Sequence, residues 1–300
     1  EGAEPYAQVW VVCLMNELHL ENHAHLDWAY RITRYLSEQH VLFDVITEKQ
    51  LTGQALAGKP ALVLAETRYL SDEQAEALRA YLSGGGVLVM AGQVGTHDEK
   101  ARPRPRPAAD LLLEASARGR CSWVASPDSL IGPCRVSRED ALEFANYAQA
   151  SINVPAGRVG VVYEVDRMLG VDRYLRQADL VPRLEEALGR ELRLAHPYDG
   201  LGVRFSAYQK ESEGRPTILL HLVNYNVPLL EDPRGVKVEP IENLQVSLPL
   251  PEGWGAASLT LLEPGQEEEA VELQVQKAAG IFTVPRLPVY KLACITSCRA

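Results

Sequence analysis

The sequence predicts two folded units: an α/β unit over residues 1–200 and a small all-β unit over residues 201–300. In the first unit, apolar runs typical of buried strands alternate with segments of helical periodicity. From about Leu201 onward, short strand-like segments follow one another, separated by turns such as Pro251-Glu252-Gly253. A chain of 300 residues can bury two such cores. We therefore expect a parallel sheet followed by an antiparallel β-sandwich.

Continuous apolar runs predict the strands of the α/β unit, because strands covered on both faces show little alternation. The expected strands cover residues 9–15, 41–46, 61–65, 87–90, 122–125 and 159–165. Between the first two, apolar residues recur at helical spacing. They are Leu26, Ala29, Tyr30, Thr33 and Leu36. This spacing predicts an amphipathic helix.

Two further helices carry start and stop signals. Ser71 and Gln74 have the spacing of a capping box, and Gly84-Gly85-Gly86 ends the segment that follows. Asp179, a first-turn Pro182 and Gly189 frame the last expected helix in the same way.

The all-β unit is expected to consist of short strands without an intervening helix. They cover residues 203–208, 217–224, 244–248, 257–262, 271–275, 281–284 and 289–295. Within the α/β unit, the alternating arginines and prolines of residues 102–107 prevent regular structure, so this segment is expected to be an exposed extended loop. A ligand for a proline-recognition domain is the alternative interpretation of this loop.

Charge and hydropathy exclude two classes of partner. The net charge of −10 argues against non-specific nucleic-acid binding, and no apolar run reaches the length of a membrane span. The chain starts Glu-Gly-Ala-Glu-Pro, which suggests processing or a piece of a longer protein. The five cysteines could form the pairs Cys121–Cys134 and Cys294–Cys298, with Cys13 as a buried thiol, and they leave the compartment undecided.

The first candidate site follows the first strand, because ligands of α/β proteins bind beyond the carboxyl ends of the strands. Polar side chains crowd the segment over residues 16–27, which is expected to be a loop. The candidates there are Asn16, Glu17, His19, His23 and His25. His23 and His25 are weak candidates for a metal centre. A subunit contact and an ordinary exposed loop are the alternatives, and no cofactor is expected.

The second candidate site is His97-Asp98-Glu99, after the strand at residues 87–90. Paired carboxylates can perform acid–base chemistry, but they can also cap a loop or contact another subunit. The turn from Gly92 to Gly95 contains no cysteine or serine that could act as a nucleophile. We therefore assign no catalytic residue.

Several segments resemble one known family. The stretch LVLAETRYLSDEQAEALRAYLSGGGVLVMAGQVGTHDE is similar to the trimerisation domain of family-42 β-galactosidases. HLVNYN, LPLPEGW, LTLLEPG and FTVPRLPVY resemble the small β-domain that ends such glycosidases. The resemblance implies a flavodoxin-like sheet of the class I glutamine-amidotransferase type without the catalytic cysteine. The family's catalytic glutamates lie on a preceding (β/α)8 barrel, to which nothing in this sequence corresponds.

The resemblance implies a non-catalytic accessory region that assembles or shapes a glycoside-hydrolase-like protein. Its expected partners are copies of itself, as in a trimer, and a carbohydrate. A stand-alone hydrolase, or a carbohydrate- or metal-binding protein on the same scaffold, is the alternative function. A carbohydrate-binding module would need exposed tryptophans among Trp10, Trp28, Trp123 and Trp254.

Overall fold

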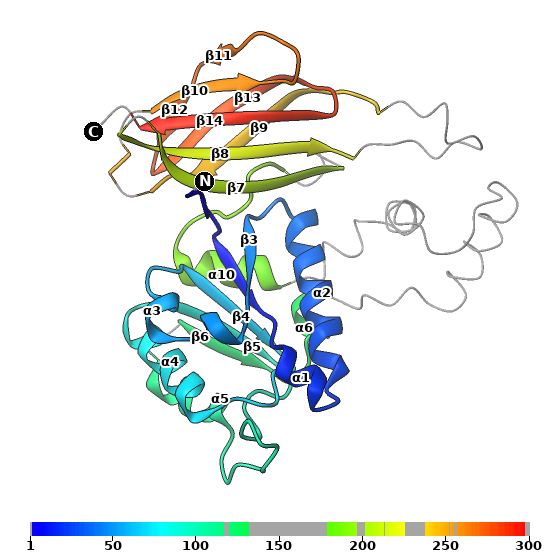
Figure 1. Cartoon of the computed structure of the whole chain (residues 1–300), viewed down its shortest axis with the longest axis vertical. Helices are drawn as coiled ribbons and strands as arrows, with labels where there is room; N and C mark the ends of the chain where they lie inside the picture. The colour runs from blue at the N-terminus through cyan, green and yellow to red at the C-terminus, as the bar shows by residue number, and fades with distance from the viewer. Residues whose placement is uncertain are drawn as a thin grey trace, which may run out of the picture.

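The computed structural model describes residues 2–116, 120–131, 179–196, 202–212, 214–225, 238–251, 253–254 and 257–297. The strand expected at residues 159–165, and Cys134 and Cys298, lie outside these ranges. Figure 1 shows a parallel sheet flanked by helices below two antiparallel sheets. The predicted fold class is confirmed. None of the helices in the described ranges is long and apolar enough to cross a membrane.

The parallel sheet has five strands in the order β3-β2-β4-β5-β6. Their bounds are β2 (Val9–Val12), β3 (Phe43–Ile46), β4 (Ala61–Ala65), β5 (Val87–Ala91) and β6 (Cys121–Val124). Counted along the chain, this is the 2-1-3-4-5 order of flavodoxin-like folds. Every residue of β2, β4 and β5 is buried, as their unbroken apolar sequence predicted.

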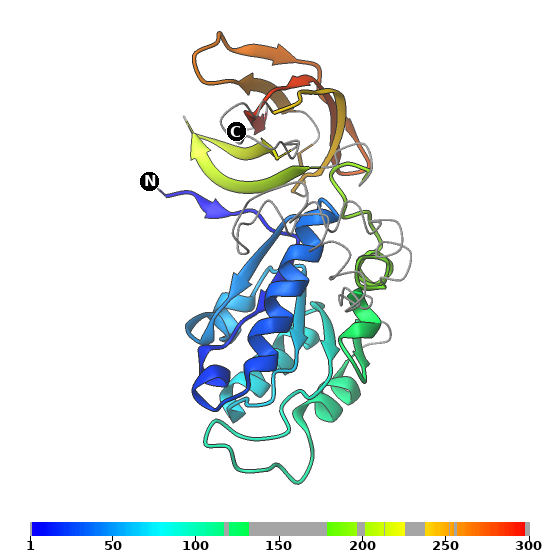
Figure 2. The same cartoon turned by 90° about the vertical axis from the view of Figure 1, so that its right-hand side faces the viewer.

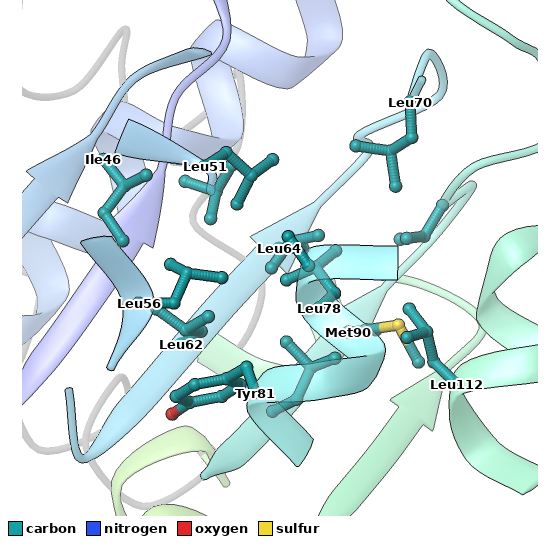
Figure 3. Packing of buried hydrophobic residues seen from close by; sticks show 14 of the residues in the cluster. Ile46, Leu51, Leu56, Leu62, Leu64, Leu70, Leu78, Tyr81, Met90 and Leu112 are labelled. Atoms are coloured by element: carbon teal, nitrogen blue, oxygen red, sulfur yellow. The ribbon is translucent and has the colours of Figure 1, made fainter. Parts of the chain in front are cut away.

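Helices cover both faces of this sheet (Figures 1 and 2). On one face lie α3 (Gly53–Leu56), α4 (Asp72–Ser83) and α5 (Ala108–Ala115), whose apolar side chains meet those of the strands in one cluster (Figure 3). On the other face, α2 (His23–Glu38), α6 (Asp128–Ile131) and α10 (Leu180–Leu188) contribute to a second cluster. Two short elements, α1 (Met15–His19) and the 3-10 helix η1 (Glu48–Gln50), follow β2 and β3.

The amphipathic helix α2 is present, but its buried face differs from the predicted one. The buried positions are His25, Ala29, Ile32, Tyr35 and Leu36. Tyr30, which was expected to be buried, is 66% exposed. The difference arises because an imidazole, His25, occupies a position that hydropathy assigns to the surface. The strand expected over residues 9–15 is also shorter, because the chain enters α1 at Met15.

The predicted start and stop of α4 are confirmed, whereas in α10 Asp179 precedes the helix without a side-chain capping bond, because its carboxylate pairs with Arg183. In α4 the Ser71 hydroxyl accepts a hydrogen bond from the backbone N–H of Gln74 (3.1 Å), and the Gln74 side chain accepts one from the N–H of Ser71 (2.9 Å). The helix ends at Gly84, and the chain turns so closely that a Cβ on Gly86 would lie 2.2 Å from the Tyr81 ring. α10 ends at Gly189 in the left-handed conformation, φ 69°.

Replacing Ser71 with alanine is expected to lower the free energy of unfolding by about 1 kcal/mol, because the first turn of α4 loses its side-chain acceptor. Urea unfolding followed by circular dichroism would measure this loss. Ser83→Ala, at the exposed end of the same helix, is the control and is expected to change stability by less than about 0.5 kcal/mol. Equal losses in both variants would contradict the capping role.

The second part of the chain forms two antiparallel sheets. The six-stranded sheet has the order β1 (Glu4–Pro5), β7 (Val203–Ser212), β8 (Arg215–Asn224), β14 (Tyr290–Ser297), β10 (Ala257–Leu262), β11 (Glu269–Val271). The three-stranded sheet has the order β12 (Gln274–Gln276), β13 (Ala279–Leu287), β9 (Ile241–Pro249). Alternate residues of both sheets share one apolar cluster. The single strand expected over residues 271–275 is two strands, because the chain leaves β11 in one sheet and enters β12 in the other.

The parallel-sheet part and the antiparallel-sheet part also contact each other through strand pairing, a hydrogen bond and apolar side chains. β1, near the N-terminus, pairs with β7 rather than with the parallel sheet (Figure 1). The Tyr6 hydroxyl donates to the carbonyl of Pro249 (2.7 Å), and Leu42 and Leu194 are buried in the core of the antiparallel sheets. The division at residue 200 stays a prediction, and residues 4–5 pair with the sheet of the second part.

The arginine–proline loop is exposed and irregular, as predicted, but ion pairs hold it in place. Arg104 pairs with Asp72 at the start of α4 (2.6 Å) and donates to the carbonyl of Leu70 (2.8 Å). Arg106 pairs with Glu114 of α5. The loop therefore packs along the ends of two helices of the sheet's first face.

Candidate functional site

The order of the parallel strands reverses between β2 and β4, and ligands of such sheets bind at the carboxyl end of this switch point. The segment over residues 16–27 lies there. It was expected to be a loop, but it forms α1 and the first turn of α2. Because the segment is helical, some of its side chains point into the protein and others into solvent.

His25 joins the ends of the two strands that flank the switch point. Its side chain is fully buried. Nε2 accepts a hydrogen bond from the backbone N–H of Leu14, after β2 (2.9 Å), so Nδ1 carries the proton and donates to the carbonyl of Ala65 in β4 (2.9 Å). Burial lowers the pKa of His25. The imidazole is thus a neutral structural bridge.

Glu17 forms a second bridge beside it. The carboxyl group is fully buried; Oε1 accepts from the backbone N–H of Tyr69 (2.7 Å) and Oε2 from the Asn22 side chain (2.5 Å). Burial raises the pKa of Glu17 to about 7, against the lowering effect of the Asn22 bond, the N–H groups of Tyr69 and Arg68, and the Arg68 charge. Asn22 also donates to the carbonyl of Glu66 (2.7 Å).

Glu17, Asn22 and His25 together occupy the switch point. Backbone groups that could bind a ligand at this edge are bonded to the chain's own side chains instead. The remaining candidates of the segment lie outside this network. His19 and His23 are exposed, and the backbone N–H of Asn16 donates to Glu48, outside the network (2.7 Å).

His23 and His25 lie on opposite sides of α2, one exposed and one buried. Both ring nitrogens of His25 are already bonded to the backbone. In the described ranges no three His, Cys, Asp or Glu side chains are grouped so that they could hold a metal ion. Nothing in the geometry of this segment therefore favours the metal centre over the alternatives.

The second candidate group has its own internal bonds. Asp98 accepts from the backbone N–H groups of Lys100 and Arg102 and from Nε of Arg102 (2.9, 2.9 and 2.6 Å). Partial desolvation opposes these bonds, but the bonds prevail and lower the pKa of Asp98. Glu99 is exposed. The arrangement is that of a side chain that caps its own loop.

Tyr69 connects the two candidate groups. Its backbone N–H binds Glu17, and its ring lies 5.6 Å from the ring of His97. Sequence reasoning missed Tyr69 and Asn22, because a backbone donor and a bridging amide leave no pattern in the sequence. It also missed Glu66, which directly follows a buried strand and adopts a positive φ of 49°. Its position after β4 was the available signal.

The free cysteines of the described ranges are poor nucleophiles. Burial raises the pKa of Cys13, and it raises that of Cys121 to about 12. Thiols with such values remain protonated at neutral pH. Cys121 is a free thiol, and Cys134, the partner considered for it, lies outside the described ranges.

The fold is that of an α/β part with flavodoxin-like topology joined to two antiparallel β-sheets. No family model matches the sequence, and no curated protein matches it. Among solved structures the chain is similar to α-L-fucosidase isoenzyme 2 from Paenibacillus thiaminolyticus, with 15% identity and a TM-score of 0.51. It is also similar to a β-galactosidase from Bacillus circulans sp. alkalophilus, with 13% identity and a TM-score of 0.50.

These alignments cover nearly all of this chain but less than half of each neighbour: 98% against 49% for the fucosidase and 97% against 42% for the galactosidase. The chain therefore has the fold of one part of these larger chains. The resemblance to β-galactosidases that the sequence predicted is confirmed at the level of fold. At such identities the similarity concerns the fold alone.

Proposed function

We propose that this chain is a non-catalytic accessory region of a glycoside-hydrolase-like protein, and that it assembles copies of the chain. The observation that carries the proposal is the occupied switch point. Glu17, Asn22 and His25 use their polar atoms to hold β2, β4 and the following loops together, so this edge stabilises the domain instead of binding a substrate. The fold shared with parts of two glycosidases supports the carbohydrate context.

The expected contact surface is the outer side of α1 and α2. Met15 on α1 and Tyr30 on α2 are exposed by 45% and 66% of their surface. Methionine and aromatic side chains are enriched at the cores of subunit interfaces. In a closed assembly the same surface would meet its copy or a complementary one, as in a trimer.

Light scattering coupled to size-exclusion chromatography tests the assembly role. We expect a multiple of the 33.1 kDa chain mass at all concentrations tested. Tyr30→Glu, which places a charge in the expected contact, should shift the mass toward that of the monomer. Tyr225→Glu, at a similarly exposed tyrosine (53%) after β8, is the matched control and should leave the mass unchanged. A wild-type monomer would contradict the proposal.

Hydrolysis assays test the non-catalytic part. We expect no turnover of nitrophenyl galactosides, fucosides or amides above the buffer blank. Turnover that persists after repurification and is lost in Glu66→Gln would instead favour the stand-alone hydrolase. A glycosidase needs a pair of suitably spaced carboxyl groups, and Glu17, the buried carboxyl group of the described ranges, is bonded to Tyr69 and Asn22.

A further inference from the structure

Three side chains near the turn after β5 lie outside the expected subunit contact. Glu66 follows β4, Gln93 follows β5 and Trp123 lies in β6, the edge strand of the sheet. Glu66 and Trp123 both contact Gly92, the first residue beyond β5. They lie at the carboxyl edge of the sheet, on the far side of β4 from the occupied switch point.

Glu66 is held against Gly92 in an unusual backbone conformation. Its φ of 49° is uncommon for a residue with a side chain, and its N–H donates to the carbonyl of Ala91 (2.9 Å). A Cβ on Gly92 would lie 1.9 Å from Oε1 of Glu66, so the carboxylate occupies the space of the missing side chain. Oε2 accepts from the backbone N–H of Gln93 (3.3 Å).

Trp123 is also bonded to Gly92. Its indole N–H donates to the carbonyl of Gly92 (2.9 Å), and the side chain is 43% exposed. Trp123 is the cross-strand neighbour of Met90. Gly92 lies just beyond β5 and has a φ of 70°, so strand alternation does not extend to it. The Glu66 carboxylate and the indole both approach this one residue, and the exposed Gln93 follows it in the chain.

We propose that Trp123, Glu66 and Gln93 bind one ring of a neutral pyranose sugar. An exposed indole whose N–H is already satisfied offers its apolar face, against which the C–H face of a pyranose can stack. A carboxylate accepts hydrogen bonds from sugar hydroxyls, and an exposed amide can donate and accept. The Glu66 charge and the net charge of −10 disfavour anionic sugars such as uronates. This site does not depend on the assembly role, because it shares no residue with the expected contact surface.

Nuclear magnetic resonance of the indole N–H groups tests the site in the full chain. Galactose, fucose and glucose are each titrated to about 100 mM, since a single ring is expected to bind with a dissociation constant on the order of millimolar. The Trp123 signal, assigned by its loss in Trp123→Phe, should shift with at least one of these sugars. Glucuronate should bind at least fivefold more weakly than glucose.

Matched variants separate the site from general effects. Trp123→Ala should weaken the binding measured by calorimetry at least tenfold, and Glu66→Gln, which keeps the shape, at least threefold. Trp28→Phe, a half-buried tryptophan on α2, should leave it unchanged. Thermal unfolding of each variant verifies that it is folded. No shift of the Trp123 signal with any neutral sugar, or equal binding to Glu66→Gln and wild type, would overturn the proposal whatever the oligomeric state.

Discussion

Replacing His25 with alanine is expected to lower the free energy of unfolding by about 3–5 kcal/mol. The imidazole is the buried partner of two backbone groups, the N–H of Leu14 and the carbonyl of Ala65, which lie at the ends of adjacent parallel strands. Alanine would leave the Leu14 N–H without its side-chain acceptor and the Ala65 carbonyl with only the long bond from the Thr67 hydroxyl (3.4 Å), and it would also leave a cavity. Urea unfolding of the purified chain measures the loss.

His23→Ala is the matched control, because His23 lies two residues earlier on the same helix and is exposed. It should change the free energy of unfolding by less than about 0.5 kcal/mol. If the two variants were equally stable, His25 would not be the bridge that holds the switch point closed, and the argument for a non-catalytic edge would lose its basis.

The wild-type chain is expected to lose stability as the pH rises from about 5 to 8, through the ionisation of Glu17. Its pKa is about 7 in the folded chain, above the ordinary value of 4.5, because the carboxyl group is buried. A raised pKa means that the folded state holds the proton more tightly than the unfolded state. The contribution is therefore complete below about pH 4.5 and disappears above about pH 7, and its size is about 3 kcal/mol.

Glu17→Gln isolates this contribution, because glutamine resembles the protonated acid but cannot ionise. The variant should lack the fall in unfolding free energy that the ionisation of Glu17 causes in the wild type over this range. Glu99→Gln, at an exposed carboxylate, should follow the wild-type curve. Parallel curves for Glu17→Gln and wild type would contradict the assignment.

His25 contributes in the opposite sense, and the two effects can be separated. Burial lowers its pKa below the ordinary value of 6.5, so its contribution is complete above about pH 6.5 and is lost as the pH falls. The unfolding free energy of Glu17→Gln is therefore expected to rise with pH in this range. The switch point thus contains a carboxyl group, Glu17, with a raised pKa and an imidazole, His25, with a lowered pKa.

Local sequence determined most of the elements. Unbroken apolar runs predicted β4 and β5 closely, since strands buried on both faces need apolar residues at every position. Ser71 marked the start of α4 and Gly189 the end of α10, because a capping hydroxyl and a glycine in the left-handed conformation both act on backbone groups nearby in the chain. The change to short alternating strands near Leu201 predicted the antiparallel sheets.

The tertiary structure alone decided the candidate site. In the sequence, Glu17, Asn22 and His25 are polar residues in a polar segment, and hydropathy assigns such residues to the surface. They are buried because the ends of β2 and β4 present unpaired backbone groups that need polar partners, and these ends are adjacent only in the folded sheet. For the same reason Glu66 and Trp123 are 57 positions apart in the sequence (123 − 66). They both contact Gly92 only because β4, β5 and β6 are paired in the sheet. Periodicity reports which residues lie along one element, whereas a site depends on which strand ends become neighbours.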